Sequence, residues 1–472
     1  MSDAQPVLDA AGNALEEATI DALRSGLRGP LLRQDDEGYD DARAIWNGMI
    51  DKRPGLIAQC TGVADVMTAV RFAREHDVRV AVKGGGHNVA GTALCDGGLV
   101  IDFSEMKGVH VDPAGRTARV EPGARLGDVD HETQAFGLAV SAGIVTTTGV
   151  AGLTLGGGFG WLSPKLGLTC DNLISADIVT ADGELVVASE EENADLFWGI
   201  RGGGGNFGVV TSFDYTLHPV GPIVLAGAVV HPMADAEQLL RYHRDFVAEA
   251  PRELCTIFAL RRAPPVPFLP PELHGKPIAV FFVCYQGPID EGERVLKDLR
   301  RFGDPLADVV MPKPFNAHQS MLDAVQPPGR NYYWKSEDLP ELTDGTIDVI
   351  VEHCNAITSP HTIVPIFQLG GAVADVDENA TAYSHRRAAY ALNCNASWED
   401  GEPMAHVQWA RDFSEALQPH SMGVYVNFMG DEGEDRTRAA YGPEKYTKLV
   451  ELKDKYDPTN FFRVNQNIKP SK

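Results

Sequence analysis

A single histidine that follows three glycines is the feature of this sequence best suited to chemistry. An apolar run, residues 80–82, leads through Lys83 into Gly84, Gly85 and Gly86, and His87 comes next. Glycines let a backbone approach a ligand closely and present successive N–H groups to an anion. The segment is typical of a phosphate-binding loop that ends in a nucleophilic imidazole. An isolated triple glycine is also typical of a strand that ends in a surface turn.

Similar glycine clusters recur twice further along the chain, which favours the ligand-binding interpretation. The stretch 143–160 alternates glycines with threonines and small apolar residues. In a later stretch, Gly203, Gly205 and Gly208 match the G-x-G-x-x-G pattern of nicotinamide cofactors, which needs a strand before it and a helix after it. Here a helix-like segment precedes the glycines and a strand-like segment, 209–217, follows them. We therefore reject a nicotinamide site and expect close packing or backbone approach to another cofactor.

The elements that must position these loops follow from the periodicity around them. Residues 63–73 repeat apolar side chains at helical spacing, so a helix and the 80–82 strand deliver the chain to His87. A domain boundary is expected near residue 220, where glycine density drops. Other expected elements are short strands at 98–102, 108–112 and 117–121, a helix at 126–136, a hairpin at 175–187, a strand at 424–428 and a helix at 446–455.

Composition narrows the class of protein. The 472 residues are 44% hydrophobic and carry 41 basic and 66 acidic residues, so the net charge of −25 argues against a nucleic-acid or anionic-membrane partner. No apolar run is long enough to span a membrane, and residues 2–6 lack the basic and apolar regions of a secretion signal, so we expect a cytoplasmic protein. Seven scattered cysteines without a C-x-x-C pair indicate buried, reduced thiols, with neither disulfides nor a metal site.

Four segments together resemble one family. They are 83–88, the glycine run 149–160, the stretch 197–208 that begins Phe-Trp-Gly-Ile-Arg, and the tail 456–468. In order and spacing they resemble the berberine-bridge-enzyme-like flavin oxidases of the vanillyl-alcohol-oxidase (PCMH-type) superfamily, over nearly the whole chain. Within that family, residues 46–48, 53–54 and 160–168 are similar to the 6-hydroxynicotine oxidase branch.

The resemblance implies an α+β, two-domain fold that binds FAD. Residues 1–220 would form the FAD-binding domain, with its PCMH-type unit at about 50–220. Residues 221–430 would form a substrate domain built on an antiparallel sheet, and 431–472 a C-terminal segment that rejoins the FAD domain. The residues expected to hold FAD are Lys83, Gly84, Gly85, Gly86, His87, Asn88, Gly91, Val145, Thr146, Thr147, Gly149, Gly152, Gly157, Gly160, Asn172, Val179, Asn465 and Asn467.

The resemblance also implies a covalent bond between the cofactor and the protein. His87 occupies the family's position for a bond from the imidazole to the flavin 8α-methyl group. Many relatives add a cysteinyl bond at the flavin 6-position from the loop that corresponds to 143–146, where this chain has Val145. We therefore expect a single covalent link, through His87.

A second departure from the family concerns the catalytic base. Relatives commonly carry a tyrosine where this chain has Phe428, which has no proton to exchange. Tyr332 and Tyr333 are replacement candidates, and we select Tyr333 because relatives place functional groups from this segment over the flavin. Tyr425 and Asn427 would share one face of the expected 424–428 strand by the period of two. The expected catalytic residues are therefore Tyr333, Tyr425 and Asn427.

The expected activity is oxidation of a small organic molecule. A hydride would pass from a CH–OH or CH–NH group of the substrate to flavin, and O₂ would reoxidise the flavin with release of H₂O₂. Two alternatives remain open: a dehydrogenase of the same fold with another electron acceptor, and a flavin-binding protein with little turnover, which the loss of the tyrosine at 428 would suggest. The sequence leaves the substrate's identity and the oligomeric state undetermined.

Overall fold

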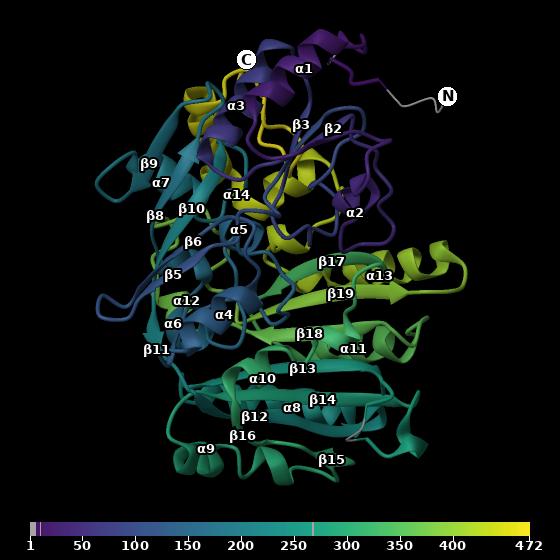
Figure 1. Ribbon diagram of the computed structural model, residues 1–472. Coiled ribbons are helices and arrows are strands. Elements are labelled where there is room, and N and C mark those ends of the chain that lie inside the picture. Colours follow the sequence, from purple (N-terminus) through teal and green to yellow (C-terminus); the bar gives the residue numbers. More distant parts are fainter. Residues whose placement is uncertain (1–5, 10, 267–268) are drawn as a thin grey trace.

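The computed structural model describes residues 6–9, 11–266 and 269–472 (Figure 1). Residues 2–5, on which part of the expectation about a secretion signal rests, lie outside the described residues. Within the described chain, no helix combines the length and the apolar composition that a membrane crossing requires. All seven cysteines are buried and free, as expected.

A small, mainly parallel sheet positions the first glycine loop. Its strand order is β1 (Leu31–Leu32), β2 (Leu56–Gln59), β4 (Leu99–Asp102) and β3 (Val80–Lys83), and both β2 and β3 run parallel to β4. Helix α3 (Val63–Glu75) joins β2 to β3 and buries Val66, Ala69 and Val70. Such a sheet is covered on both faces, which explains the unbroken apolar runs of its strands. Helices α1 (Glu17–Gly26) and α2 (Tyr39–Arg43) precede it.

A five-stranded antiparallel sheet carries the second and third glycine clusters. Its order is β5 (Val109–Asp112), β6 (Thr117–Val120), β10 (Val209–Thr216), β8 (Leu173–Val179) and β9 (Leu185–Ser189). The expected 175–187 hairpin is the β8–β9 pair. Helix α7 (Ala194–Ile200) precedes the 202–205 glycines and β10 follows them, so the order is the reverse of a nicotinamide-binding unit. Further elements here are α4 (Leu126–Gln134), β7 (Leu138–Ala139), α5 (Val150–Leu155), α6 (Ser163–Leu166), the 3₁₀ helix η1 (Thr169–Asn172) and β11 (His218–Pro219).

A third, eight-stranded sheet forms the lower half of the molecule in Figure 1. All its pairings are antiparallel, and its order is β15 (Ala307–Asp308), β12 (Ile223–Pro232), β14 (Pro277–Tyr285), β13 (Leu254–Arg262), β18 (Ile363–Gln368), β19 (Tyr390–Trp398) and β17 (Asn331–Leu339), with β16 (Met311–Pro314) paired to β12.

The two faces of this sheet have different neighbours. Helices α8 (Ala236–Glu249), α11 (Asp344–Asn355) and α13 (Pro403–Leu417) share one apolar cluster with residues of one face, such as Phe258. The opposite face, which includes Ile257, packs with residues of the first half such as Phe159. Each strand therefore sends alternate side chains to the helices and to the first half. Shorter helices in this region are α9 (Ile289–Val295), α10 (Phe315–Gln319) and α12 (Ala372–Asp375).

The C-terminal segment returns to the first half of the chain. Helix α14 (Glu434–Tyr456, yellow in Figure 1) packs against α7, and its last turns bury Leu449 and Leu452 in the same apolar cluster as Phe197. Beyond it, the Ile468 N–H donates to Asn206 Oδ1, and Lys453 Nζ donates to the Asn206 carbonyl. The tail thereby closes over the third glycine cluster.

One expected strand is not formed. Residues 426–428 are a 3₁₀ turn, η7 (Val426–Phe428), in which the Phe428 N–H donates to the Tyr425 carbonyl. Only Gly423 makes a bridge to the sheet, to Asp338, so no neighbouring strand holds this segment extended. The period-of-two argument for Tyr425 and Asn427 is therefore wrong, although both side chains reach the same cavity.

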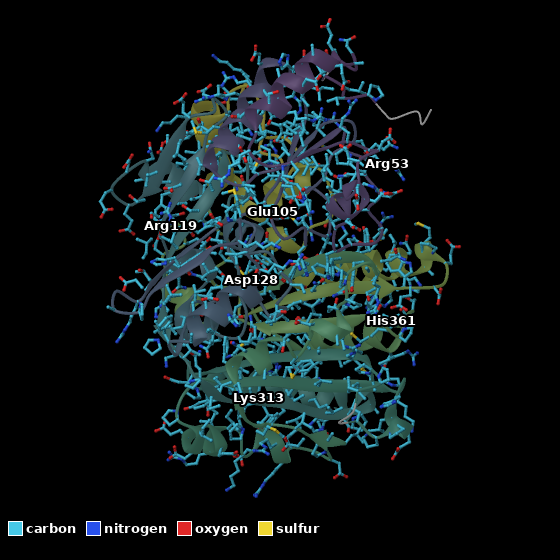
Figure 2. All side chains as sticks on the ribbon, in the orientation of Figure 1. Arg53, Glu105, Arg119, Asp128, Lys313 and His361 are labelled. Carbon is cyan, nitrogen blue, oxygen red and sulfur yellow. The ribbon has the colours of Figure 1, made fainter. Side chains whose placement is uncertain are left out.

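The net negative charge lies on side chains around the outside of the molecule (Figure 2). The few basic residues there are mostly paired with acidic ones, as for Arg119, whose guanidinium lies 3.0 Å from the Asp214 carboxylate. Exposed pairs of this kind contribute little stability.

Candidate functional site

One cavity of about 320 Å³ lies between the glycine loops of the first half and the inner face of the eight-stranded sheet. Its walls come from distant parts of the chain: the loop after β3, the 143–153 segment, the 204–210 segment, five strands of the large sheet (β13, β14, β17, β18 and β19), and the 462–466 tail. Glycines dominate one end of the lining, and aromatic and aliphatic side chains dominate the other.

His87 lies at the junction of these two ends. Its ring stacks on Trp46 with the ring centroids 4.3 Å apart, and Trp46 in turn stacks on Tyr332 at 3.6 Å. His87 Nε2 is buried without a hydrogen-bond partner. Burial lowers the pKa of His87 to about 3, so the imidazole is neutral at physiological pH. A neutral ring held rigidly between aromatic neighbours retains a nucleophilic nitrogen lone pair.

Close contact between two glycine loops shapes the narrow end of the cavity. A Cβ atom on Gly85 would lie 2.4 Å from the Gly149 Cα, so any larger residue at position 85 would separate the loops. Lys83 lies beneath this contact and does not line the cavity: its Nζ donates to the Ala42 carbonyl and lies 3.6 Å from Asp102. Burial lowers the pKa of Lys83. Through these two contacts, Lys83 stabilises the 84–86 loop without lining the cavity.

Tyr425 and Asn427 form a hydrogen-bonded pair at the wide end. Asn427 Nδ2 donates to Tyr425 Oη at 2.8 Å, and the Gly158 N–H donates to the same oxygen at 3.0 Å. A Cβ atom on Gly156 would lie 2.1 Å from Asn427 Oδ1, so glycine is required there for Asn427 to enter. Burial raises the pKa of Tyr425. Phe428 packs edge-on against the Tyr425 ring, with the centroids 4.9 Å apart.

The structure brings eleven of the expected site residues to the cavity wall: Gly84, Gly85, Gly86, His87, Asn88, Val145, Gly149, Gly152, Asn465, Tyr425 and Asn427. Nine others are not among the described residues that line the cavity. Among these, Thr146 binds Asp323 through its N–H and its hydroxyl, and Asn172 Nδ2 donates to the Leu166 and Leu168 carbonyls. The other seven are Lys83, Gly91, Thr147, Gly157, Gly160, Val179 and Asn467.

Tyr333 lies outside the cavity. It packs against the helix-covered face of the large sheet, and its hydroxyl accepts a hydrogen bond from Arg411 Nε. Its neighbours Tyr332 and Trp334 point the other way because side chains alternate along β17. The position of Tyr333 therefore does not support the catalytic role that the sequence led us to expect.

Sequence reasoning missed several lining residues, above all Trp46 and the pair Asn393 and Asn395. Every residue of β19 is buried, so its burial pattern does not mark one face as the inner face. The Asn-x-Asn spacing itself was the available signal, because two polar residues two positions apart in a buried strand face the same side.

These residues fit FAD, the cofactor that the resemblance implies. The glycine loops offer backbone close enough to hold phosphates, and two lining residues carry a buried polar atom without a partner within the described protein: His87 Nε2 and Asn465 Oδ1. The wide end offers flat aromatic walls.

Comparison with known proteins agrees with this fit. Residues 54–189 match the family described as an FAD binding domain, and residues 424–469 match the family described as berberine and berberine like. An FAD-linked oxidoreductase of Dictyostelium discoideum is 34% identical over 458 residues, which cover 96% of this chain and 97% of that protein. The (R)-6-hydroxynicotine oxidase of Paenarthrobacter nicotinovorans is 30% identical over 461 residues, which cover 94% and 97%.

Solved structures share the whole fold. The carbohydrate oxidase from Microdochium nivale, in complex with a substrate analogue, superimposes with a TM-score of 0.84 at 25% identity, covering 96% of this chain and 100% of that one. Full-length similarity at this level, together with the glycine loops and His87 around one cavity, establishes the class of protein. The chain belongs to the berberine-bridge-enzyme-like family of FAD-linked oxidoreductases and is an FAD-binding enzyme with the α+β fold of that family.

Proposed function

We propose that this enzyme is an oxidase that removes a hydride from a CH–OH or CH–NH group of a small organic substrate. FAD, when bound, accepts that hydride and returns the electrons to O₂, which yields H₂O₂. The observation that carries the proposal is the continuity of one cavity from the glycine loops past His87 into an aromatic chamber. The chain thus offers a cofactor site and a substrate site in direct contact.

We propose further that His87 forms the single covalent link to FAD. Its neutral imidazole, unpartnered Nε2 and stacking on Trp46 support this role. The described lining residues include Val145 and no cysteine, and Cys170 points its sulfur toward Asp171, 3.8 Å away. Burial raises the pKa of the Cys170 thiol well above its usual range, which keeps it protonated and unreactive.

Within the chamber, we assign proton handling to Tyr425 and its positioning to Asn427. Both lone pairs of Tyr425 Oη accept hydrogen bonds from the protein, so the hydroxyl is fixed in place. The surrounding rings of Phe159, Phe367 and Phe428 exclude water from the reacting end of the substrate.

The covalent link is tested by acid precipitation of the purified holoenzyme. Flavin fluorescence should remain in the washed pellet of the wild type and should move to the supernatant for His87→Ala. His110→Ala, at an exposed histidine on β5, is the matched control and should retain flavin in the pellet. Release of all flavin from the wild type would contradict the assignment of His87.

The oxidase assignment is tested separately through the electron acceptor. With a substrate that bleaches the flavin anaerobically, admission of O₂ should restore the colour and release one H₂O₂ per substrate oxidised. Reoxidation by a quinone or dye, with O₂ ineffective, would instead identify a dehydrogenase.

A further inference from the structure

The chamber beside His87 carries no charged side chain. The described residues that line the cavity include no Asp, Glu, Lys or Arg, and burial keeps the one lining histidine, His87, neutral. A charged ligand group that leaves water needs an opposite charge or a dense set of hydrogen bonds. The wall of this chamber offers no opposite charge, so a carboxylate or an ammonium group would enter at a large free-energy cost.

Two asparagines on β19 provide the polar character of the sheet wall. Asn393 and Asn395 are 2% and 3% exposed, both line the cavity, and the Oδ1 atom of each is buried without a hydrogen-bond partner among the described residues. In the sheet, Asn395 pairs with Trp334 on one side and with Ile363 on the other. Two adjacent unpaired carboxamides among apolar neighbours form a built site, since unsatisfied buried acceptors are rare in folded proteins.

The chemistry of carboxamides defines what this site binds. A carboxamide is uncharged: its oxygen accepts a hydrogen bond from an O–H or N–H group and its NH₂ group donates to an oxygen, but unlike a carboxylate it neither attracts a cation strongly nor removes a proton. The remaining sheet wall consists of Ile257, Phe282, Ile363, Pro365 and Phe367, which make apolar contacts. One end of the bound molecule is therefore polar and uncharged, and the rest is apolar.

We propose that Asn393 and Asn395 are the specificity-determining residues for the substrate, and that the substrate is an uncharged aromatic molecule whose O–H or N–H group donates to them. This inference rests on the proposed function only in naming the ligand a substrate. The proposal excludes carboxylates and ammonium ions as substrates, because the chamber wall offers no opposite charge. It also excludes oligosaccharides, because an oligosaccharide would bring many hydroxyls against an apolar wall that cannot form hydrogen bonds with them.

The test compares three probes of one shape on the FAD-containing enzyme: benzamide, benzoate and benzylammonium, at neutral pH. Binding is followed by the change in the flavin absorption spectrum, with cellobiose as a fourth probe. Benzamide should bind at least about tenfold more tightly than either ion. A tenfold ratio of binding constants corresponds to about 1.4 kcal/mol, and burial of an unpaired charge costs more free energy than that. Equal or tighter binding of either ion, or of cellobiose, would overturn the proposal.

Variants at the asparagines test the role of these two residues. Asn395→Asp introduces a carboxylate of nearly the same shape and should reverse the preference, so that benzylammonium binds more tightly than benzamide. Asn393→Asp should shift the preference in the same direction. The control Asn355→Asp, at an exposed site on α11, should leave the wild-type order of probe affinities unchanged. A wild-type order in both chamber variants, each shown to be folded by thermal unfolding, would contradict the assignment.

The outcomes also separate this inference from the proposed function. If benzamide is preferred but no neutral aromatic alcohol or amine bleaches the flavin, the binding site stands and the oxidase assignment fails. If a charged molecule or a sugar is oxidised efficiently with release of H₂O₂, the oxidase assignment stands and the neutral aromatic site is wrong.

Discussion

Among residues, Tyr425 has the most constrained chemistry in the chamber. Its oxygen accepts from Gly158 and Asn427, while burial raises its pKa. The two donors stabilise a phenolate, and desolvation opposes it more strongly, so the hydroxyl keeps its proton in the resting protein. Phe428, which has no hydroxyl, packs directly against this ring. The tyrosine to which we assign proton handling thus lies three positions before the one expected from relatives.

We predict that Tyr425→Phe lowers kcat by about 10²- to 10⁴-fold with an alcohol substrate and leaves FAD bound. Because a base must be deprotonated and the pKa of Tyr425 is raised, the wild-type kcat should increase with pH into the alkaline range, and the variant should lose that increase. Steady-state kcat against pH measures both effects.

The matched control for this tyrosine is Tyr333→Phe, which removes a hydroxyl outside the cavity and should keep the wild-type rate and pH profile. A full loss of rate in Tyr333→Phe, or a wild-type rate in Tyr425→Phe, would contradict the assignment of Tyr425. The catalytic tyrosine would then have to be sought on strand β17.

Among elements, the contact between helices α4 and α10 connects the two halves of the molecule behind the cavity wall. Asp130 on α4 is buried, and its Oδ2 atom has no hydrogen-bond partner. Gln319 on α10 donates from Nε2 to the Gly143 carbonyl at 2.9 Å, at the start of the loop that holds Val145. Burial raises the pKa of Asp130 to about 8, and a hydrogen bond from Gln319 opposes this shift. The contact therefore requires a protonated carboxyl.

We predict that Asp130→Asn reduces the loss of stability with rising pH. Between the ordinary aspartate pKa near 4 and about 8, the folded state holds a proton on Asp130 that the unfolded state releases, so the free energy of unfolding falls as pH rises, by up to about 1.4 kcal/mol per pH unit. The asparagine has no proton to lose. Urea unfolding at pH 5, 6.5 and 8 measures the slope.

Asp338, whose pKa burial also raises to about 8, should leave a residual slope of the same sign in the Asp130→Asn protein. The control Asp348→Asn, at an exposed site on α11, should show the wild-type slope. Identical slopes for wild type and Asp130→Asn would show that Asp130 is ionised in the folded protein.

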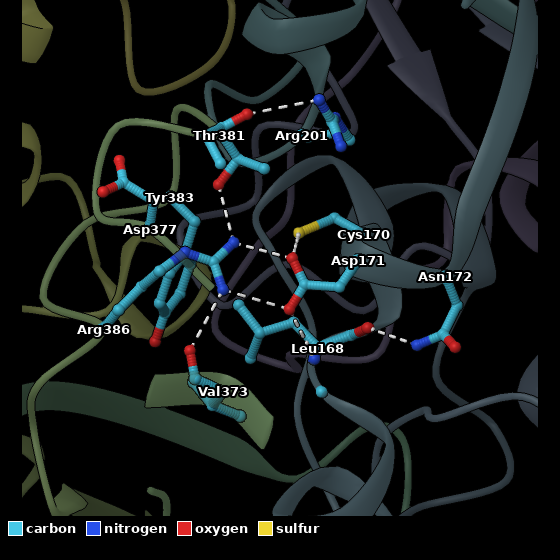
Figure 3. A network of polar contacts seen from close by, with 12 residues as sticks. Leu168, Cys170, Asp171, Asn172, Arg201, Val373, Asp377, Thr381, Tyr383 and Arg386 are labelled. Carbon is cyan, nitrogen blue, oxygen red and sulfur yellow. Dashed lines mark hydrogen bonds and ion pairs between the residues drawn. The ribbon is translucent and has the colours of Figure 1, made fainter. Parts of the chain in front are cut away.

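At the scale of the whole molecule, a buried ion pair joins the first half to the large-sheet half (Figure 3). The Arg386 guanidinium donates to both oxygens of Asp171, at 2.6 Å and 3.0 Å, and also to the Thr381 hydroxyl and the Val373 carbonyl. Arg386 is 1% exposed. Asp171 lies in η1, whose Thr169 and Cys170 N–H groups donate to the Gly158 and Gly157 carbonyls, so this pair links the segment before β19 to the second glycine cluster.

We predict that Arg386→Met lowers the free energy of unfolding by about 3–5 kcal/mol, because it leaves the Asp171 carboxylate buried without its partner. The double variant Asp171→Asn, Arg386→Met should lose less than the single variant, since the uncompensated charge is removed. Equilibrium denaturation in guanidinium measures all three proteins.

Arg252→Met provides the contrast, because its pair with Asp375 is more than half exposed, so solvent screens it and its loss should change the free energy of unfolding little. A loss in Arg386→Met no larger than in Arg252→Met would show that the halves are held together by apolar contacts alone.

The sequence by itself determined the local features of this protein. The glycines before His87 and the helix–strand units that deliver them are properties of neighbouring residues, and the order of four motifs was enough to identify the family, the fold and FAD. Expectations of this kind succeed because backbone freedom, periodicity and turn chemistry are set within a few positions.

Only the tertiary structure decided which side chains share the chamber with His87. Trp46 lies more than 300 residues before Asn395 and Tyr425 in the sequence, and the outcome for Tyr332 and Tyr333 depends on which face of β17 turns inward. Both faces of β19 are buried, so although polar and apolar residues alternate along 392–398, only the packing decides which of the two sets faces the cavity. The charge-free chamber is a product of strand order and register, which long-range packing determines.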